Sequence, residues 1–285
     1  MKIGITDYYI KRYGLDEGAK RMAEHGYSCI DFQLTNPDTE YYTTREEDFM
    51  SLVLGVRRTF EKHGISVHQI HGPWQNPNKD STEDERAELF GKMAKALVIA
   101  KHLCAKYMVV HPLMPHGVNS DENPDEVYEI NKRYFSALAN VAQGLGVTVC
   151  LENTPFEKFP LAKTEKLISL IKDIEHPCLK MCFDTGHAFL LGENLGDSVR
   201  QTGKNYLKAI NVHDNLGDKD THLSPYEGYI DWSDFAEGLF DIDFDGVFSL
   251  ETSPVSEKDI EDDISKEVIQ EKEQELARVA KLIAG

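Results

Sequence analysis

The feature that most constrains this chain is a regular alternation of short β-rich runs with longer segments of helical periodicity. The sequence predicts eight strands, at residues 2–6, 29–33, 66–71, 107–111, 147–152, 179–184, 207–213 and 247–251. It predicts helices between and after them, at residues 15–25, 45–63, 82–104, 124–145, 161–174, 193–204, 233–240 and 259–283. Eight β–α units in sequence favour one α/β (β/α)8 barrel over a doubly wound sheet.

The length supports the same fold. Barrels of this class often fill about 250 residues as one domain, and the chain has 285 residues without a Pro- or Ser-rich linker. We therefore expect residues 1–285 to form a single domain. The acidic stretch at residues 257–275 is interpreted as a solvated helix face.

Charge and composition exclude several classes of protein. With 31 Lys and Arg against 49 Asp and Glu, the net charge is −18, which disfavours binding to nucleic acid and to anionic membranes. The longest apolar stretch, residues 94–100, is too short to span a bilayer. The chain begins with a predicted strand, so we expect no signal peptide. Five cysteines without a CxxC pair indicate a reduced, cytoplasmic protein.

Ionisable side chains gather at the carboxyl ends of the predicted strands, where barrel enzymes carry their active sites. The strand ends contribute His71, His111, Glu152, Asp184 with His187, His213 and Glu251, and the loop after the seventh strand adds Asp220 and His222. Alternation along the third strand turns His71 inward and His68 outward. Each residue alone is typical of an ordinary hydrogen-bonding role. Nine of them at one rim indicate a divalent metal, because buried carboxylates and histidines are costly without a compensating partner.

Several short motifs carry a family resemblance. They are His71-Gly72-Pro73-Trp74, Val110-His111-Pro112, Leu151-Glu152-Asn153-Thr154, Phe183-Asp184-Thr185-Gly186-His187-Ala188, Val212-His213-Asp214 and Leu250-Glu251-Thr252. Through these motifs the chain resembles the xylose isomerase-like TIM-barrel superfamily, which includes the endonuclease IV nucleases, ketose 3-epimerases, and inosose isomerases and dehydratases. The resemblance covers essentially the whole chain.

The resemblance implies two different metal sites. Endonuclease IV holds three zinc ions with nine ligands, and all nine have matches here, although the interval from His213 to Asp220 is shorter than in those nucleases. The epimerase pattern holds one metal through the positions that match Glu152, Asp184, His213 and Glu251, with His187 contacting sugar oxygens. Lys219 matches, although only loosely, a position where the epimerases carry an arginine. We expect Mn, Zn, Co or Mg, in one site and at most three.

The charge balance favours a small sugar, sugar-phosphate or polyol substrate over DNA. An abasic-site nuclease grips phosphates with Lys and Arg, whereas the predicted rim loops are acidic or neutral. Trp74 matches the intercalating aromatic residue of the nucleases. It is equally suited to pack against the apolar face of a sugar. His116 is a further candidate substrate contact, with a surface histidine as the alternative. Relatives are often dimers or tetramers, so this protein could also form a homo-oligomer.

The resemblance implies proton transfer next to a carbonyl, through an enediolate that the metal stabilises. Glu152 and Glu251 are the predicted catalytic residues, one removing a proton and the other delivering one; pure metal ligation is the alternative for each. Three further readings stay open: a zinc-dependent apurinic endonuclease, an enolate-type dehydratase or lyase, and a barrel that has lost its activity.

Overall fold

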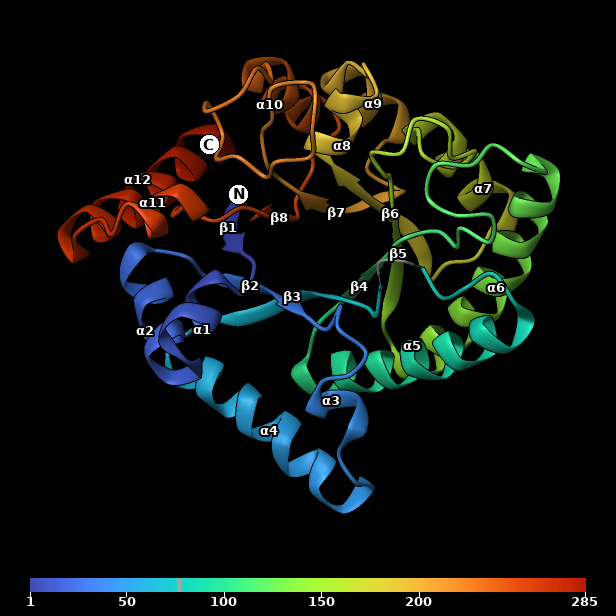
Figure 1. Cartoon of the computed structure of the whole chain (residues 1–285), viewed down its shortest axis with the longest axis horizontal. Helices are drawn as coiled ribbons and strands as arrows, with labels where there is room; N and C mark the ends of the chain where they lie inside the picture. Colours follow the sequence, from blue (N-terminus) through green and yellow to red (C-terminus); the bar gives the residue numbers. More distant parts are fainter. Residues whose placement is uncertain (76–77) are drawn as a thin grey trace.

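Eight parallel strands form the centre of the structure, and the helices surround them (Figure 1). In this computed structural model, residues 1–75 and 78–285 are described. The strands are β1 (Lys2–Ile5), β2 (Cys29–Gln33), β3 (Ser66–His71), β4 (Tyr107–Val110), β5 (Thr148–Glu152), β6 (Leu179–Asp184), β7 (Leu207–Asn211) and β8 (Val247–Leu250). The helices are α1 (Tyr8–Tyr13), α2 (Leu15–His25), α3 (Glu40–Thr43), α4 (Glu46–Lys62), α5 (Glu83–Leu103), α6 (Pro124–Leu145), α7 (Thr164–Ile174), α8 (Thr185–Leu190), α9 (Leu195–Thr202), α10 (Trp232–Asp241), α11 (Glu257–Glu261) and α12 (Lys266–Ala284).

The sheet closes into a barrel, as the alternation predicts. Consecutive strands are neighbours from β1 to β7, and β8 pairs with β1 in parallel. The last seam is short: Val212, just after β7, bridges Leu250 and bonds to Ser249 and Glu251 through the backbone. In Figure 1 the colours pass round the barrel from blue to red, so the first and last strands meet. All strand carboxyl ends therefore face one end of the barrel.

The helices form because their apolar residues repeat at helical spacing. In α6 the buried residues recur every three or four positions, so one face packs on the barrel. Thr82 begins α5 with a reciprocal capping box to Glu85. Gly26 and Gly146 end α2 and α6 in the left-handed conformation that glycine adopts without strain.

Three short helices were not predicted, and one predicted helix is divided. Helices α1, α3 and α8 are too short to show a periodicity in the sequence. The predicted helix at residues 259–283 is interrupted between α11 and α12: Asp263 has a positive φ of 48°, and Ser265 caps the new helix by accepting from Val268 N. The ends of β4, β7 and β8 lie one or two residues earlier than predicted, so His111 and Glu251 directly follow their strands and His213 is the second residue after β7.

The prediction of a solvated acidic face at residues 257–275 is wrong for Glu273. Its side chain is fully buried, and its Oε1 accepts hydrogen bonds from the hydroxyls of Tyr8 and Tyr13 at 2.9 and 2.7 Å. These bonds fix α12 against α1. Within residues 1–75 and 78–285, no helix combines the length and the apolar character that a membrane crossing requires.

Candidate metal centre

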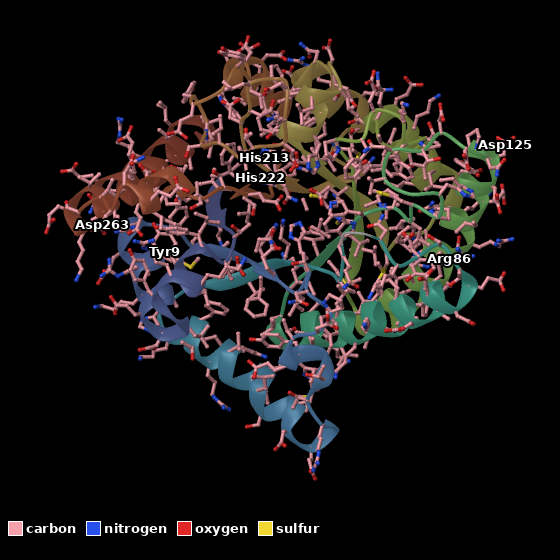
Figure 2. The ribbon with its side chains drawn as sticks, viewed as in Figure 1. Tyr9, Arg86, Asp125, His213, His222 and Asp263 are labelled. Atoms are coloured by element: carbon pink, nitrogen blue, oxygen red, sulfur yellow. The ribbon has the colours of Figure 1, made fainter. Side chains whose placement is uncertain are left out.

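The structure brings the strand-end residues together at one end of the barrel. The candidate metal centre is defined here as the following nine residues: His71, His111, Glu152, Asp184, His187, His213, Asp220, His222 and Glu251. In Figure 2 the labelled His213 and His222 lie near the middle of the molecule, whereas Arg86, Asp125 and Asp263 lie at its periphery. Three subsets place one ligand atom per residue within 4.8 Å of one another.

The first subset is His71, Glu152 and Glu251. His71 Nε2 lies 3.6 Å from Glu152 Oε2 and 3.9 Å from Glu251 Oε1. His111 Nε2 approaches the same Glu152 oxygen at 3.3 Å. Glu152 and His71 are buried, and the Glu251 side chain is 20% exposed, so this subset lies just below the barrel mouth.

The second subset adds Asp184 and His187 to Glu152. Asp184 ends β6 and caps α8, because its Oδ1 accepts from the backbone N of His187 at 2.7 Å. This capping turns the motif at residues 184–187 into the start of a helix and aims both side chains into the barrel. His187 Nδ1 lies 2.8 Å from the carbonyl oxygen of Asn153, which fixes the plane of its ring.

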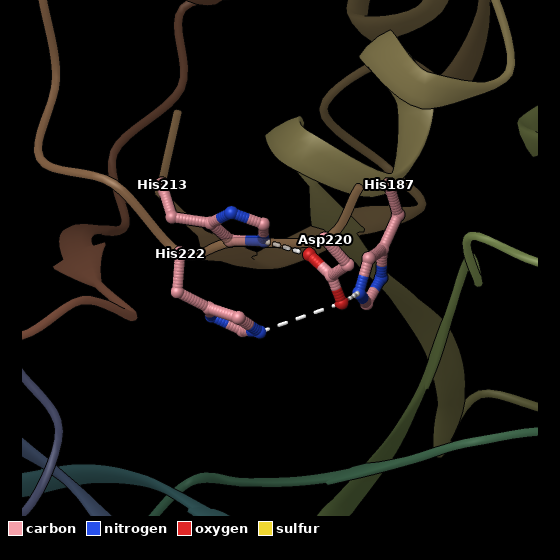
Figure 3. Close-up of side chains that lie close together, drawn as sticks. All are labelled: His187, His213, Asp220 and His222. Carbon is pink, nitrogen blue, oxygen red and sulfur yellow. Dashed lines mark hydrogen bonds and ion pairs between the residues drawn. The ribbon is translucent and has the colours of Figure 1, made fainter. Parts of the chain in front are cut away.

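The third subset joins His187 and His213 to the loop residues Asp220 and His222 (Figure 3). Asp220 lies between the histidines: its Oδ2 is 3.1 Å from His187 Nε2 and 3.4 Å from His222 Nε2, and its Oδ1 is 3.7 Å from His213 Nε2. The rings of His213 and His222 stack at 4.0 Å. The shortened interval after His213 therefore still delivers Asp220 and His222 to the centre.

Asp214 organises the loop that carries these two residues. It is fully buried, and its carboxylate accepts hydrogen bonds from the backbone N of Asn215, Tyr226 and Ile230 and from Trp232 Nε1. Its backbone pairs with Leu223 in an isolated bridge. Asp214 thus folds the chain back so that residues 220 and 222 face the barrel axis.

A layer of buried polar side chains, which the sequence reasoning missed, supports the centre. Gln69 Nε2 donates to Asp31 Oδ2 at 3.2 Å and to Asn211 Oδ1 at 2.9 Å, across the barrel interior. Asn211 Nδ2 donates to Glu152 Oε1 at 2.7 Å, and Asp31 Oδ2 lies 2.7 Å from His71 Nδ1. The layer therefore fixes one oxygen of Glu152 and contacts both nitrogens of His71, because Asn211 Nδ2 also lies 3.1 Å from His71 Nε2. The second oxygen of Glu152 is left for the centre.

The unpartnered atoms fit a bound cation. Among the described residues, the buried oxygens Glu152 Oε2, Asp184 Oδ2 and Glu251 Oε2 have no hydrogen-bond partner, and neither ring nitrogen of His213 has one. His213 Nε2 lies 3.0 Å from Asp184 Oδ1 without forming a hydrogen bond. Leaving such groups unpaired is costly, and carboxylate oxygens with imidazole nitrogens are the donor set of Zn, Mn and Co. A divalent cation would supply a partner for such atoms, and the four side chains are spread over the three subsets.

Burial and mutual charge give the metal-free centre unusual proton affinities. Burial and the adjacent Glu152 carboxylate raise the pKa of Glu251 to about 8, although His71 opposes this shift. For Glu152 burial acts in the same direction, but His111 and His71 outweigh it and hold its pKa well below the usual value. Burial lowers the pKa of His222, yet Asp220 and Glu251 raise it to about 10. The metal-free centre therefore holds protons at neutral pH.

Metal binding is expected to release these protons. Below pH 8 Glu251 is mainly protonated in the metal-free protein, and it binds a cation as a carboxylate. Each ion taken up near pH 7 should therefore release about one proton or more, and affinity should rise with pH through this range. Calorimetric titration in buffers of different ionisation enthalpy measures this release. Glu251→Gln should reduce it, and a metal affinity that is constant between pH 6 and 8 would contradict the prediction.

Gly186 gives His213 its space. A Cβ atom at this position would overlap the His213 imidazole. Gly186→Ala is therefore expected to displace His213 and to lower metal content, as measured by elemental analysis. Gly91→Ala in α5 is the matched control, because nothing lies within 4 Å of its added Cβ and alanine stabilises a helix by up to about 1 kcal/mol relative to glycine. Full metal content in Gly186→Ala would show that His213 is dispensable.

The predicted substrate contacts lie at different distances from the centre. Trp74 packs beside His111, with ring centroids 5.4 Å apart. His116 lies on the loop after β4, where its Nε2 is 3.3 Å from Glu126 Oε2 of α6. Lys219 is exposed on the loop beside Asp220. Of these three side chains, that of Trp74 packs on a member of the centre.

Comparison with known proteins agrees with this geometry. The family model for the xylose isomerase-like TIM barrel matches residues 19–273. The chain belongs to this family. The resemblance inferred from the strand-end motifs is thereby confirmed.

Several relatives of this xylose isomerase-like protein are known. An uncharacterised protein of Methanocaldococcus jannaschii is 28% identical over 279 residues, which cover 95% of this chain and 89% of that protein. A D-psicose 3-epimerase of Ruminiclostridium cellulolyticum is 24% identical over 195 residues, 66% of this chain and 64% of the relative. A probable endonuclease 4 of Mesomycoplasma hyopneumoniae is 26% identical over 192 residues, 60% of this chain and 64% of the relative.

Solved structures show the same fold. The crystal structure of a D-psicose 3-epimerase in the presence of D-fructose superposes with a TM-score of 0.79 at 18% identity and covers 100% of both chains. The IOLI protein, crystallised with a zinc atom, superposes with a TM-score of 0.74 at 18% identity, over 99% of this chain and 96% of that one.

Proposed function

We propose that the protein is a divalent-metal-dependent isomerase or epimerase of a small sugar or polyol, which acts by proton transfer next to a carbonyl group. The observation that carries this proposal is the pair Glu152 and Glu251. They extend from β5 and from the end of β8, both reach His71, and each has a buried oxygen without a hydrogen-bond partner.

The placement of this pair supports a division of labour. Each carboxylate can hold the metal through one oxygen and exchange a proton through the other, because each has a buried oxygen without a hydrogen-bond partner among the described residues. We assign Glu152 as the base that removes a proton from carbon, and Glu251, once protonated, as the acid that returns one.

The cation would be held by Glu152, Asp184, His213 and Glu251. When bound, it would supply Lewis-acid stabilisation of negative charge on the substrate oxygens. His187, with its Nδ1 fixed by the Asn153 carbonyl oxygen, directs Nε2 toward the site and would bind a substrate hydroxyl. Family membership and the D-psicose 3-epimerase relative support a sugar as the substrate.

The test of this function is solvent-deuterium incorporation into a ketose panel by the metal-loaded protein. Exchange that requires the metal supports the proposal. If every ketose remains free of deuterium while the protein is folded and loaded, the proposal is wrong. A dehydratase or lyase acting through the same enolate would show loss of water or chain cleavage in the same spectra.

A second candidate function is a zinc-dependent apurinic endonuclease. The gathering of all nine residues, with Asp220 among three histidines, favours it, and so does the endonuclease 4 relative. The net charge of −18 opposes it, because duplex docking depends on phosphate contacts from cationic side chains.

We therefore expect no efficient cleavage of abasic duplex DNA. The measurement is nicking of an abasic-site oligonucleotide with Zn²⁺ at low salt. Charge interactions between the protein and the DNA are least screened under this condition. An unmodified duplex is the control for contaminating nucleases. Zn²⁺-dependent nicking restricted to the abasic site would establish the nuclease function instead.

A further inference from the structure

A cavity of about 460 Å³ connects the candidate metal centre with helix α1. At one end its lining includes Glu251 and His222 of the centre, and at the other Lys11 and Arg12 of α1. The Glu251 side chain is 20% exposed and that of Lys11 is 73% exposed, so the cavity leads from the buried centre to solvent. Its volume falls within the range of about 300–1,000 Å³ that is usual for small-molecule sites.

The outer end of this cavity is cationic, although the chain is strongly acidic. Lys11 Nζ pairs with Asp7 Oδ1 at 3.0 Å. Among the side chains that the structure describes, no carboxylate lies within ion-pair distance of Arg12. Its planar guanidinium carries several donors in a fixed fork, which suits the oxygens of a phosphate or carboxylate. One positive charge therefore remains at this end after Lys11 and Asp7 compensate each other.

Helix α1 is held in place by hydrogen bonds to α12. The hydroxyls of Tyr8 and Tyr13, on either side of Lys11 and Arg12, both donate to the buried Glu273 of α12. The backbone that carries the two cations is thus fixed to the barrel before any ligand arrives. A preorganised site of this kind loses less entropy on binding than a mobile loop does.

We propose that this cavity binds the anionic end of an extended polyol substrate, a phosphate ester or a carboxylate, through Arg12 and Lys11. The proposal rests on the function proposed above, because the carbonyl end of the same substrate would lie against Glu251. The cavity also contains the hydroxyl-bearing residues Thr6 and Ser253, which suit the hydroxyls of the chain between its two ends. The substrate class is then an anionic sugar derivative rather than a free sugar.

The experiment compares three ligands that differ only at the far end: a 2-ketohexose, its 6-phosphate ester and its 6-carboxylate analogue. Their dissociation constants are measured by calorimetry on the metal-loaded wild type and on the double variant Lys11→Gln/Arg12→Gln. The control is Lys132→Gln/Arg133→Gln in α6, which removes the same two charges from another adjacent Lys–Arg pair. Thermal unfolding verifies that each variant is folded.

In the wild type and the control, at least one anionic ligand should have a dissociation constant about tenfold or more below that of the neutral ketohexose. This difference is expected for charge-assisted hydrogen bonds. The Lys11/Arg12 variant should lose this preference, and added salt should weaken it. The tighter of the two anions identifies the group as phosphate or carboxylate. Equal affinity for all three ligands, or a preference that survives in the Lys11/Arg12 variant, would overturn the proposal.

The same samples separate this proposal from the proposed function. If the wild type shows metal-dependent deuterium exchange but no preference for an anion, the proposed function is supported and the anion site is refuted. A preference that depends on Lys11 and Arg12, without exchange in any of the three ligands, supports the anion site and refutes the function.

Discussion

Replacement of His213 by alanine is expected to remove the metal and the activity together. His213 is fully buried, stacks on His222, and has two ring nitrogens without a hydrogen-bond partner. Alanine removes a nitrogen ligand that no neighbouring side chain can replace without leaving its own partners. Metal content by elemental analysis should fall from about one ion per chain or more to near zero, and deuterium exchange should disappear. The unfolding temperature of the variant should no longer respond to a chelator.

The control for this variant is His102→Ala in the last turn of α5, outside the candidate metal centre. It should keep both the metal and the activity. If His213→Ala binds metal as the wild type does, His213 is not a ligand. If it loses activity while keeping its metal, the residue acts on the substrate instead.

Replacement of Glu152 by glutamine is expected to slow exchange by about 10²-fold or more, the usual contribution of one general base. Glutamine keeps the size of the side chain and an oxygen that can accept from Asn211 Nδ2, but it cannot take up a proton. Metal content should survive in part, because Asp184, His213 and Glu251 remain. Elemental analysis and exchange rates, measured on the same sample, separate the two effects.

Glu251→Gln should behave in the same way, since Glu251 is the proposed acid. Glu129→Gln on the exposed face of α6 is the matched control and should leave both quantities unchanged. Near-full exchange in loaded Glu152→Gln would show that Glu152 is a ligand only. Complete loss of metal from this variant would make ligation its main role.

The barrel could be predicted because its repeat is strong. The bounds of β2, β3 and β6 agree with the sequence prediction, since each is a compact run of strand-forming residues followed by a polar end. Helix α8 could not be predicted from periodicity, because it has six residues. It depends instead on one capping bond, from the backbone N of His187 to Asp184 Oδ1, which a strand-to-turn interpretation of this motif does not reveal.

The strand-end rule identified the ligand candidates but not the residues that support them. Asp31, Gln69 and Asn211 lie inside strands, where local patterns assign positions to the core. Their signal was a polar or charged residue within an otherwise apolar strand. The partners of such a residue lie on other strands, as Gln69 of β3 and Asn211 of β7 show, so their roles depend on barrel closure.

Long-range contacts also explain what was missed at α1. The residues between β1 and α2 carry no clear helical periodicity, and Glu273 lies in an acidic stretch typical of solvated helices. The folded barrel places Tyr8 and Tyr13 against Glu273, and Lys11 and Arg12 of the same helix line the cavity at Glu251.

The central claim is that the protein moves a proton next to a carbonyl with the help of a divalent metal. The most direct measurement is nuclear magnetic resonance of ketohexoses and their 6-phosphates incubated in D₂O with the metal-loaded protein, the chelated protein and loaded Glu152→Gln. We expect deuterium at a carbon adjacent to the carbonyl with the loaded wild type, none with the chelated protein, and incorporation slowed by about 10²-fold or more with loaded Glu152→Gln. Deuterium that enters equally with and without metal, or that never enters although the folded protein holds its metal, would contradict the account.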